Sequence, residues 1–181
     1  FHPETIRFFI LSSHYRSPVN FSDTALKESE KKLSKVYYFR KDCITFEGQY
    51  WWEIKNLKVN HRKIERLNEF FEVQILSNDF KNAMCDDFNT PKAIAILFQT
   101  IKLIKKIQED VRNFDVKFAS GEYNFESFIF NYLRLMKDFN FMTEVLNISA
   151  PNKDGSHSKR KIFQFIKNYE NSVNNGDGLI D

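Results

Sequence analysis

Residues that break regular structure are scarce in this chain, and this scarcity limits the folds open to it. The 181 residues include only five glycines and four prolines. Because these two residues most strongly interrupt helices and strands, long uninterrupted segments are favoured over many short strands. Apolar residues make up 42% of the sequence, enough at this length to build a core without disulfide staples. The sequence therefore predicts an all-α protein, an antiparallel helical bundle with short connections.

Apolar residues recur at helical spacing in the segments expected to form this bundle. Residues three or four apart share one face of a helix. The expected apolar stripes are Leu26, Leu33, Val36 and Tyr37; Ile64, Leu67, Phe71 and Ile75; Ile94, Leu97, Ile101, Ile104 and Val111; and Phe125, Phe128, Tyr132, Leu135, Phe139 and Met142. The second segment is expected to kink at residues 77–79. The bundle is predicted to span residues 23–150, followed by a linker, a C-terminal helix and a polar tail in residues 151–181.

Residues 1–22 are expected to form a helix and turn that precede the bundle. Pro3 suits the first turn of a helix, and Ser17 before Pro18 disfavours its continuation. Phe8, Phe9 and Ile10 make this helix apolar enough to predict burial on more than one side. The chain also begins at Phe1 without an initiator Met, which indicates a piece of a longer protein.

Residues 41–60 are the least regular part of the sequence, and we expect an irregular loop or hairpin-like insertion there. Gly48, Trp51 and Trp52 lie in it. Two roles are open for the tryptophans: they cap the end of the bundle, or they stack on a nucleobase.

A dense group of capping residues marks the clearest helix boundary, at residues 86–91. Proline tolerates the first helical position, so Pro91 predicts Thr90 as the N-cap of the next helix. Adjacent carboxylates point in different directions, which argues against an acid–base pair and favours interaction with the positive end of that helix. The residues expected to act as structural caps are Asp86, Asp87, Asn89, Thr90 and Pro91.

Charge is nearly balanced, with 27 basic and 24 acidic residues and a net charge of +3. This balance by itself indicates no particular partner. The basic residues nevertheless gather in three groups, for which a solvated helix face and a phosphate-binding face are both open. These groups are Lys31, Lys32, Lys35, Arg40 and Lys41; His61, Arg62, Lys63 and Arg66; and Lys102, Lys105 and Lys106.

The sequence offers no parts for chemistry within this chain. The four histidines and two cysteines lack the spacing of metal ligands, and no glycine-rich phosphate loop occurs. We therefore expect no catalytic residue and no bound metal or cofactor. Cys43 and Cys85 are expected to be free thiols in a reducing compartment. No membrane-spanning run or secretory signal is present, so a cytoplasmic protein is expected.

The turn at His14, Tyr15 and Arg16 is the best candidate for ligand binding. A guanidinium offers a forked set of donors to phosphate, and a tyrosine offers a stacking face. The alternative is structural: His14 and Tyr15 pack the turn while Arg16 pairs with an acid.

Two segments of the chain resemble, in the same order, the part of cysteinyl-tRNA synthetases that follows the catalytic core. Residues 2–18, extended by 20–22 and 25–26, resemble the segment after the second signature loop of that family. Residues 83–84 and 86–91, with Ala93, resemble its helical-domain signature, and Cys85 departs from it. The span from the first to the last of these residues covers about half of the chain. The His-Ile-Gly-His and Lys-Met-Ser-Lys-Ser signatures and the zinc ligands of the family are absent from this sequence.

The resemblance implies the helical, tRNA-binding portion of an enzyme that attaches cysteine to its tRNA at the expense of ATP. In it, residues 1–22 would be the stem-contact segment that connects the catalytic domain to the bundle. ATP and zinc are implied for the parent enzyme, not for this chain, which alone should be inactive. The implied partners are the tRNA for cysteine and an upstream catalytic domain of the same polypeptide; nothing indicates the oligomeric state. The residues expected to contact tRNA are Arg7, His14, Tyr15, Arg16, Lys31, Lys35 and Arg62.

Two other functions are compatible with the sequence. The near-neutral charge fits a helical interaction module that binds no nucleic acid. A related cysteine-ligating enzyme that forms an amide with a sugar amine, as in the mycothiol pathway, would share the bundle.

Overall fold

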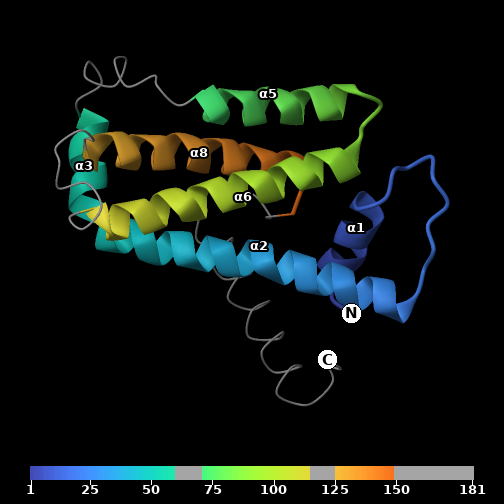
Figure 1. Ribbon diagram of the computed structural model, residues 1–181. Coiled ribbons are helices and arrows are strands. Elements are labelled where there is room, and N and C mark those ends of the chain that lie inside the picture. The colour runs from blue at the N-terminus through green and yellow to red at the C-terminus, as the bar shows by residue number, and fades with distance from the viewer. Residues whose placement is uncertain (60–70, 115–124, 149–181) are drawn as a thin grey trace, which may run out of the picture.

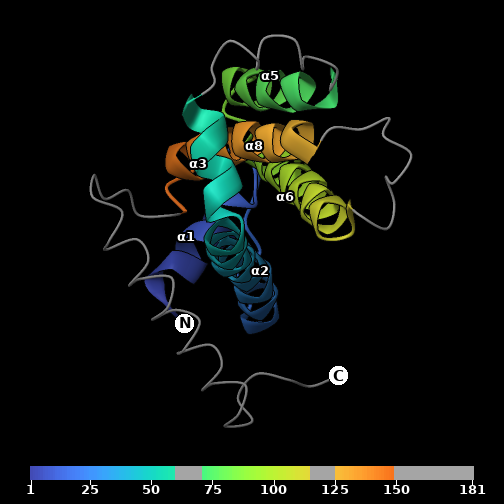
Figure 2. The ribbon, with the colours of Figure 1, turned by 90° about the vertical axis from the view of Figure 1, so that its left-hand side faces the viewer.

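The computed structural model describes residues 1–59, 71–114 and 125–148, and every regular element in these ranges is an α-helix. Helices α5, α6 and α8 follow one another in antiparallel fashion, and α2 lies along the other side of α6 (Figure 1). Helix α3 crosses one end of this bundle, while α1 lies at the other end against α2 (Figures 1 and 2). The prediction of an all-α antiparallel bundle is confirmed. The helices are α1 (Pro3–Leu11), α2 (Asp23–Gln49), α3 (Trp51–Val59), α5 (Phe71–Cys85), α6 (Thr90–Arg112) and α8 (Phe125–Val145).

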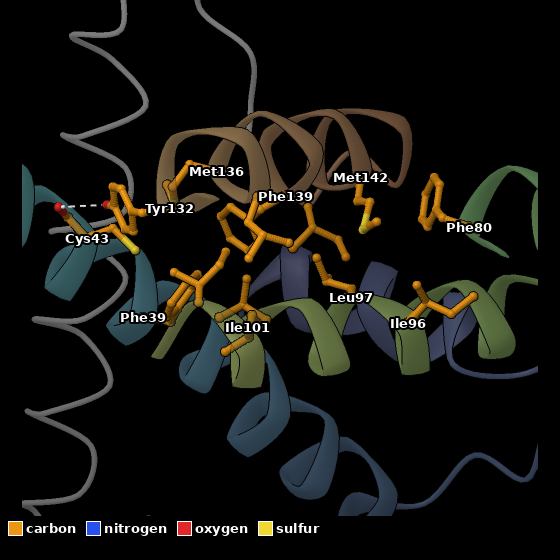
Figure 3. Close-up of a cluster of buried hydrophobic side chains, with 14 of the residues drawn as sticks. Phe39, Cys43, Phe80, Ile96, Leu97, Ile101, Tyr132, Met136, Phe139 and Met142 are labelled. Carbon is orange, nitrogen blue, oxygen red and sulfur yellow. Dashed lines mark hydrogen bonds between the residues drawn. The ribbon is translucent and has the colours of Figure 1, made fainter. Parts of the chain in front are cut away.

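The core lies where α2, α6 and α8 meet, and α5 covers its far side with Phe80 (Figure 3). Phe39 and Phe139 pack edge to face there, with ring centroids 5.0 Å apart. Leu97 of α6 is fully buried beside them. The residues of the stripes expected on α2, α6 and α8 are buried, except that Phe125 is half-buried at the start of α8. Each large apolar side chain buried in this way contributes roughly 1.5–3 kcal/mol.

Helix α1 buries one face and exposes the other. Thr5, Phe8 and Phe9 are buried, whereas Ile6 is 38% exposed and Ile10 is 58% exposed. A helix turns about 100° per residue, so positions 5, 8 and 9 share one face while 6 and 10 share another. The expected burial is therefore right for Phe8 and Phe9, while the face that carries Ile10 is exposed within this chain.

The expectation of an irregular insertion at residues 41–60 is wrong over the described part, residues 41–59. Helix α2 continues to Gln49, and α3 begins at Trp51 after a single residue outside regular structure, Tyr50. Cys43 and Phe46 are buried and extend the apolar stripe of α2, which holds the helix together in this region. Gly48 is exposed with open space around its Cα, so a helix can tolerate it at a cost of about 1 kcal/mol relative to alanine.

Helix α5 differs from its prediction in two respects. It runs from Phe71 to Cys85 without a kink at residues 77–79. Ile75, expected on the buried stripe, is 52% exposed and lines an open groove between α5 and α6. Other predictions fall outside the described residues: those for Arg62, Ile64 and Leu67, and those for residues 151–181.

Candidate nucleic-acid interface

The turn that follows α1 is held by its own polar groups. Ser12 ends the helix, and both its backbone N–H and its hydroxyl donate to the carbonyl of Phe8, at 2.9 and 2.8 Å. Further along, the backbone N–H of Arg16 donates to Nδ1 of His14 at 3.3 Å, and that of Ser17 donates to the His14 carbonyl at 2.8 Å. These bonds fold residues 12–17 into a compact turn. The side chains of Tyr15 and Arg16 point from it toward the bundle.

The connection from α5 to α6 is equally compact and conformationally strained. Asp87 and Phe88 both adopt positive φ angles, 52° and 50°. This left-handed conformation costs a non-glycine residue roughly 1–2 kcal/mol, less for aspartate. The backbone N–H of Asn89 donates to the carbonyls of Ala83 and Asp86, at 3.0 and 3.1 Å, which closes the loop over the end of α5. The side chain of Asp87 is thereby directed toward the turn after α1.

The two turns meet in a cluster formed by His14, Tyr15, Arg16 and Asp87, which we call the Asp87 cluster. The Tyr15 hydroxyl donates to Oδ1 of Asp87 at 2.6 Å, and Nη2 of Arg16 lies 3.2 Å from the same oxygen. Nε of Arg16 donates to the Tyr15 hydroxyl at 2.8 Å. The imidazole of His14 stacks on Tyr15, with centroids 5.0 Å apart, and its Nε2 lies 4.0 Å from Oδ2 of Asp87. Residues 72 positions apart are joined in this way.

The Asp87 cluster is a surface feature. The side chain of Arg16 is 68% exposed and that of Asp87 is 40% exposed, so their ion pair stabilises the fold by about 1 kcal/mol or less. The hydrogen bond to the Asp87 carboxylate raises the pKa of Tyr15 above its usual value, an effect that Arg16 partly offsets. The cluster is thus better suited to fixing the position of the turn than to stabilising the whole chain.

The carboxylates of the α5–α6 connection differ in role from the sequence prediction. The N-cap of α6 is Asn89, whose side chain accepts from the N–H of Lys92 at 3.2 Å. Thr90 is the first helical residue and not the cap, as had been expected, and Pro91 follows it in the first turn. Asp87 binds Tyr15 and Arg16 across the fold and does not cap the helix, while Asp86 is exposed. A structural role for Asp87 was expected from the sequence, but its contacts with Tyr15 and Arg16 were not.

Arg7 connects α1 to the end of α8. Its Nη1 donates to the carbonyl of Asn147 at 3.1 Å. Asn147 has a φ of 51°, and the N–H of Ile148 reaches back to the carbonyl of Thr143 at 3.0 Å, a pattern that ends a helix. This bond uses one of the five N–H donors that a guanidinium carries.

Lys31 and Lys35 lie on the exposed face of α2, together with Lys27 and opposite the buried stripe. Residues four apart on a helix rise by about 6 Å, so these lysines form a row of positive charge along the bundle. Arg62, the last residue expected to contact tRNA, lies outside the described residues.

The described residues offer few candidates for other kinds of site. Within the described ranges, no group of three or more His, Cys, Asp or Glu side chains is arranged to hold a metal ion. Cys43 and Cys85 are both free thiols, the first buried and the second exposed. Burial raises the pKa of Cys43 to about 12, which leaves it unreactive at neutral pH. None of the described helices is long and apolar enough to cross a membrane.

The chain is similar to one family model and to several cysteine–tRNA ligases. Residues 79–122 match the DALR domain. The chain is 45% identical over 106 residues to a cysteine–tRNA ligase of Acinetobacter baumannii, a stretch that covers 59% of this chain and 19% of that protein. It is 35% identical over 124 residues to the cysteine–tRNA ligase of Legionella pneumophila, covering 68% of this chain and 23% of that protein. The search for similar solved structures returned no match.

This chain therefore spans about a fifth of the length of the relatives that it matches. The resemblance noted in the sequence is confirmed as a similarity to cysteine–tRNA ligases. The DALR match begins on α5 and includes the α5–α6 connection, where Asp87 lies.

Proposed function

We propose that this chain, a relative of the cysteine–tRNA ligases that contains a DALR domain, is the helical portion of such an enzyme and binds the tRNA for cysteine. The observation that carries the proposal is the 45% identity to a cysteine–tRNA ligase over 106 residues. The parent enzyme would join cysteine to its tRNA in the cytoplasm, where proteins are made. ATP and zinc would serve that reaction in the parent enzyme, outside this chain.

The exposed row of lysines on α2 supports a binding role directed at phosphates. Lys31 and Lys35 project from a long, well-packed helix, so their positions are fixed relative to one another. Contacts of this kind position an RNA through its backbone and carry little sequence information. Affinity should therefore depend strongly on salt, because each neutralised phosphate releases counterions.

The Asp87 cluster suits the junction between this bundle and an RNA stem. Asp87 holds Arg16 and Tyr15 in a fixed position at the surface, where 68% of the Arg16 side chain remains exposed. A forked guanidinium can contact a carboxylate and a phosphate together, because its five donors point in several directions. Asp87 thus orients Arg16 without using all of its donors.

The exposed face of α1 suits the upstream catalytic domain as a partner. Ile6 and Ile10 form the side of α1 that faces away from α2, and they leave apolar surface in contact with water. The resemblance of residues 2–18 to the segment after the second signature loop implies a catalytic domain before α1 in the parent enzyme, and the matched stretch covers only 19% of the Acinetobacter baumannii relative. We assign this face to contact with that domain.

Filter binding of a tRNA transcript to the full chain tests the proposal. The tRNA for cysteine should be retained, and its affinity should fall steeply as salt rises. Replacing Lys31 and Lys35 together by alanine should weaken binding and reduce the salt slope by about two. Lys81→Ala is the matched control, because Lys81 is exposed on α5 in the opposite layer of the bundle and should leave both quantities unchanged.

Two results would contradict the proposal. Absence of salt-dependent affinity for the tRNA would favour an amide-forming cysteine ligase or an interaction module. Equal tRNA affinity of the wild-type chain and the double lysine variant would show that Lys31 and Lys35 of α2 do not contribute to tRNA binding.

A further inference from the structure

We propose that Trp51 and Trp52, together with Lys55, form a stacking site for unpaired nucleobases of RNA. The two tryptophans are 60% and 65% exposed at the start of α3. They lie at the end of the bundle opposite α1 (Figure 1). Indole rings with this much exposed apolar surface are the side chains best suited to stack on bases. The proposal rests on the proposed function, because it assumes that RNA lies along the bundle.

Lys55 places a positive charge next to both rings. Its Nζ lies 5.8 Å from the centroid of the Trp51 ring and 5.9 Å from that of the Trp52 ring. Lys55 is three and four residues beyond the tryptophans, so one turn of helix brings all three side chains together. The ammonium can meet the phosphate of a nucleotide whose base stacks on the open face of either ring. A π face with an adjacent cation is the usual composition of sites that bind single-stranded nucleic acid.

A hollow beside Trp51 offers room for a base. It has a volume of about 640 Å³, lies between α3 and α8, and includes Trp51 in its wall. Ile54 and Met136 supply apolar surface, while Glu144 supplies a carboxylate. Apolar walls suit the faces of a planar ring, and a carboxylate suits its exocyclic amines. A base that enters from the side of Trp51 would therefore meet complementary chemistry.

The size of the surface favours a nucleobase over a protein partner. Stable protein interfaces bury about 800 Å² on each partner around an apolar centre. Here two rings stand beside charged groups, with Glu47 and Lys137 in the same hollow. A site of this kind accommodates one or two flat rings. Helix α2 has 27 residues, so about 40 Å separates its two ends, a distance that a folded RNA can span.

Tryptophan fluorescence tests this proposal directly, because Trp51 and Trp52 are the two tryptophans of the chain. The full chain is titrated with a short single-stranded RNA of mixed sequence, and with the same strand annealed to its complement. The single strand should quench the fluorescence to saturation, and the duplex should not. Trp51→Ala and Trp52→Ala should each weaken single-strand affinity roughly 5- to 150-fold, and each variant keeps one fluorophore to report on the other ring.

Phe21→Ala is the matched control. Phe21 is 66% exposed and lies just before the start of α2, whereas Trp51 and Trp52 lie just after its end. Removing the Phe21 ring should therefore leave the quenching unchanged. Lys55→Gln should reduce the salt slope for the single strand by about 0.7, whereas Lys55→Arg should restore it. Circular dichroism verifies that each variant keeps its helices.

The possible outcomes separate this proposal from the proposed function. Retention of tRNA on filters without quenching by single strands would overturn the stacking site and leave the proposed function standing. Quenching by the single strand without retention of the tRNA would overturn the proposed function and leave a stacking site for other single-stranded RNA. Equal quenching by duplex and single strand would overturn the stacking site, because paired bases are already stacked.

Discussion

The two ends of the bundle are closed by polar contacts of opposite character. At the end near α1, the Asp87 cluster joins two turns at the surface. At the other end, the Tyr132 junction, formed by Cys43, Glu47, Gln108 and Tyr132, joins three helices. There the Tyr132 hydroxyl lies 3.2 Å from Oε1 of Glu47 and 3.5 Å from the carbonyl of Cys43 (Figure 3). Nε2 of Gln108 lies 3.6 Å from the sulfur of Cys43.

Burial decides what each set of contacts can do. Tyr132, Cys43 and Gln108 are buried and only Glu47 is exposed, so losing the Glu47 carboxylate leaves the Tyr132 hydroxyl away from water. Burial also raises the pKa of Tyr132 above its usual value, which keeps the hydroxyl protonated as a donor. The Asp87 cluster is open to water, which replaces any bond that breaks. The buried junction thus stabilises the bundle, while the exposed cluster positions groups and remains free to exchange partners.

One cysteine lies near each end of the bundle. The difference between their rates of thiol labelling should be the largest effect. Cys85 is exposed at the end of α5 near the Asp87 cluster, and Cys43 is buried in the Tyr132 junction. Burial raises the pKa of Cys43 from 9.0 to about 12, which lowers its thiolate population roughly a thousandfold at pH 8. A disulfide reagent at pH 8 should therefore label one thiol rapidly and the second only in denaturant. Fast labelling of both would show that the buried end opens readily.

Removing a core ring should cost the most stability. Phe139 is 1% exposed and packs against Phe39, so Phe139→Ala should lower the free energy of unfolding by about 3–5 kcal/mol. Urea denaturation followed by circular dichroism measures this loss. Phe141→Ala is the control on the same helix: Phe141 is 42% exposed, and the expected loss is about 1 kcal/mol or less. Similar losses for both would contradict the assignment of the core.

Removing one buried hydroxyl should have an intermediate effect. Tyr132→Phe keeps the ring and deletes the bond to Glu47, so unfolding should become easier by about 1 kcal/mol. A double-mutant cycle with Glu47→Ala, which removes the acceptor oxygen, isolates the pair, since neighbouring residues show coupling when they interact. Zero coupling would mean that Tyr132 acts through its ring alone.

The pattern of apolar residues was sufficient to predict most of the hydrophobic core. Leu97, Ile104 and Phe139 fall on helical stripes, and burial of such stripes follows from periodicity alone. Residues 41–59 were misjudged because Gly48 and the two tryptophans suggested a break, whereas Cys43 and Phe46 continue the stripe. Local composition was given more weight than the packing that overrides it.

The exposed end could not be predicted in the same way. Tyr15 and Asp87 are 72 residues apart, and no periodicity relates two turns. Their contact depends on the placement of α1 against α2 and on the positive φ of Asp87, both of which arise from the tertiary structure. The sequence did indicate that Arg16 would pair with an acid if its role were structural, but it could not identify which one. Whether these residues contact tRNA stays a prediction.

Asp87→Asn should give the smallest change in stability and the sharpest change in local electrostatics. The amide keeps the shape and an acceptor oxygen, so the free energy of unfolding should change by less than about 1 kcal/mol. The carboxylate is the main cause of the raised pKa of Tyr15, and its loss should therefore lower that pKa. NMR of selectively labelled tyrosine rings across an alkaline titration measures the shift. Asp86→Asn is the adjacent control, because Asp86 is exposed and Tyr15 bonds to Asp87. If Asp87→Asn cost as much stability as Phe139→Ala, the exposed cluster would be a structural support like the buried junction, and the contrast between the two ends would fail.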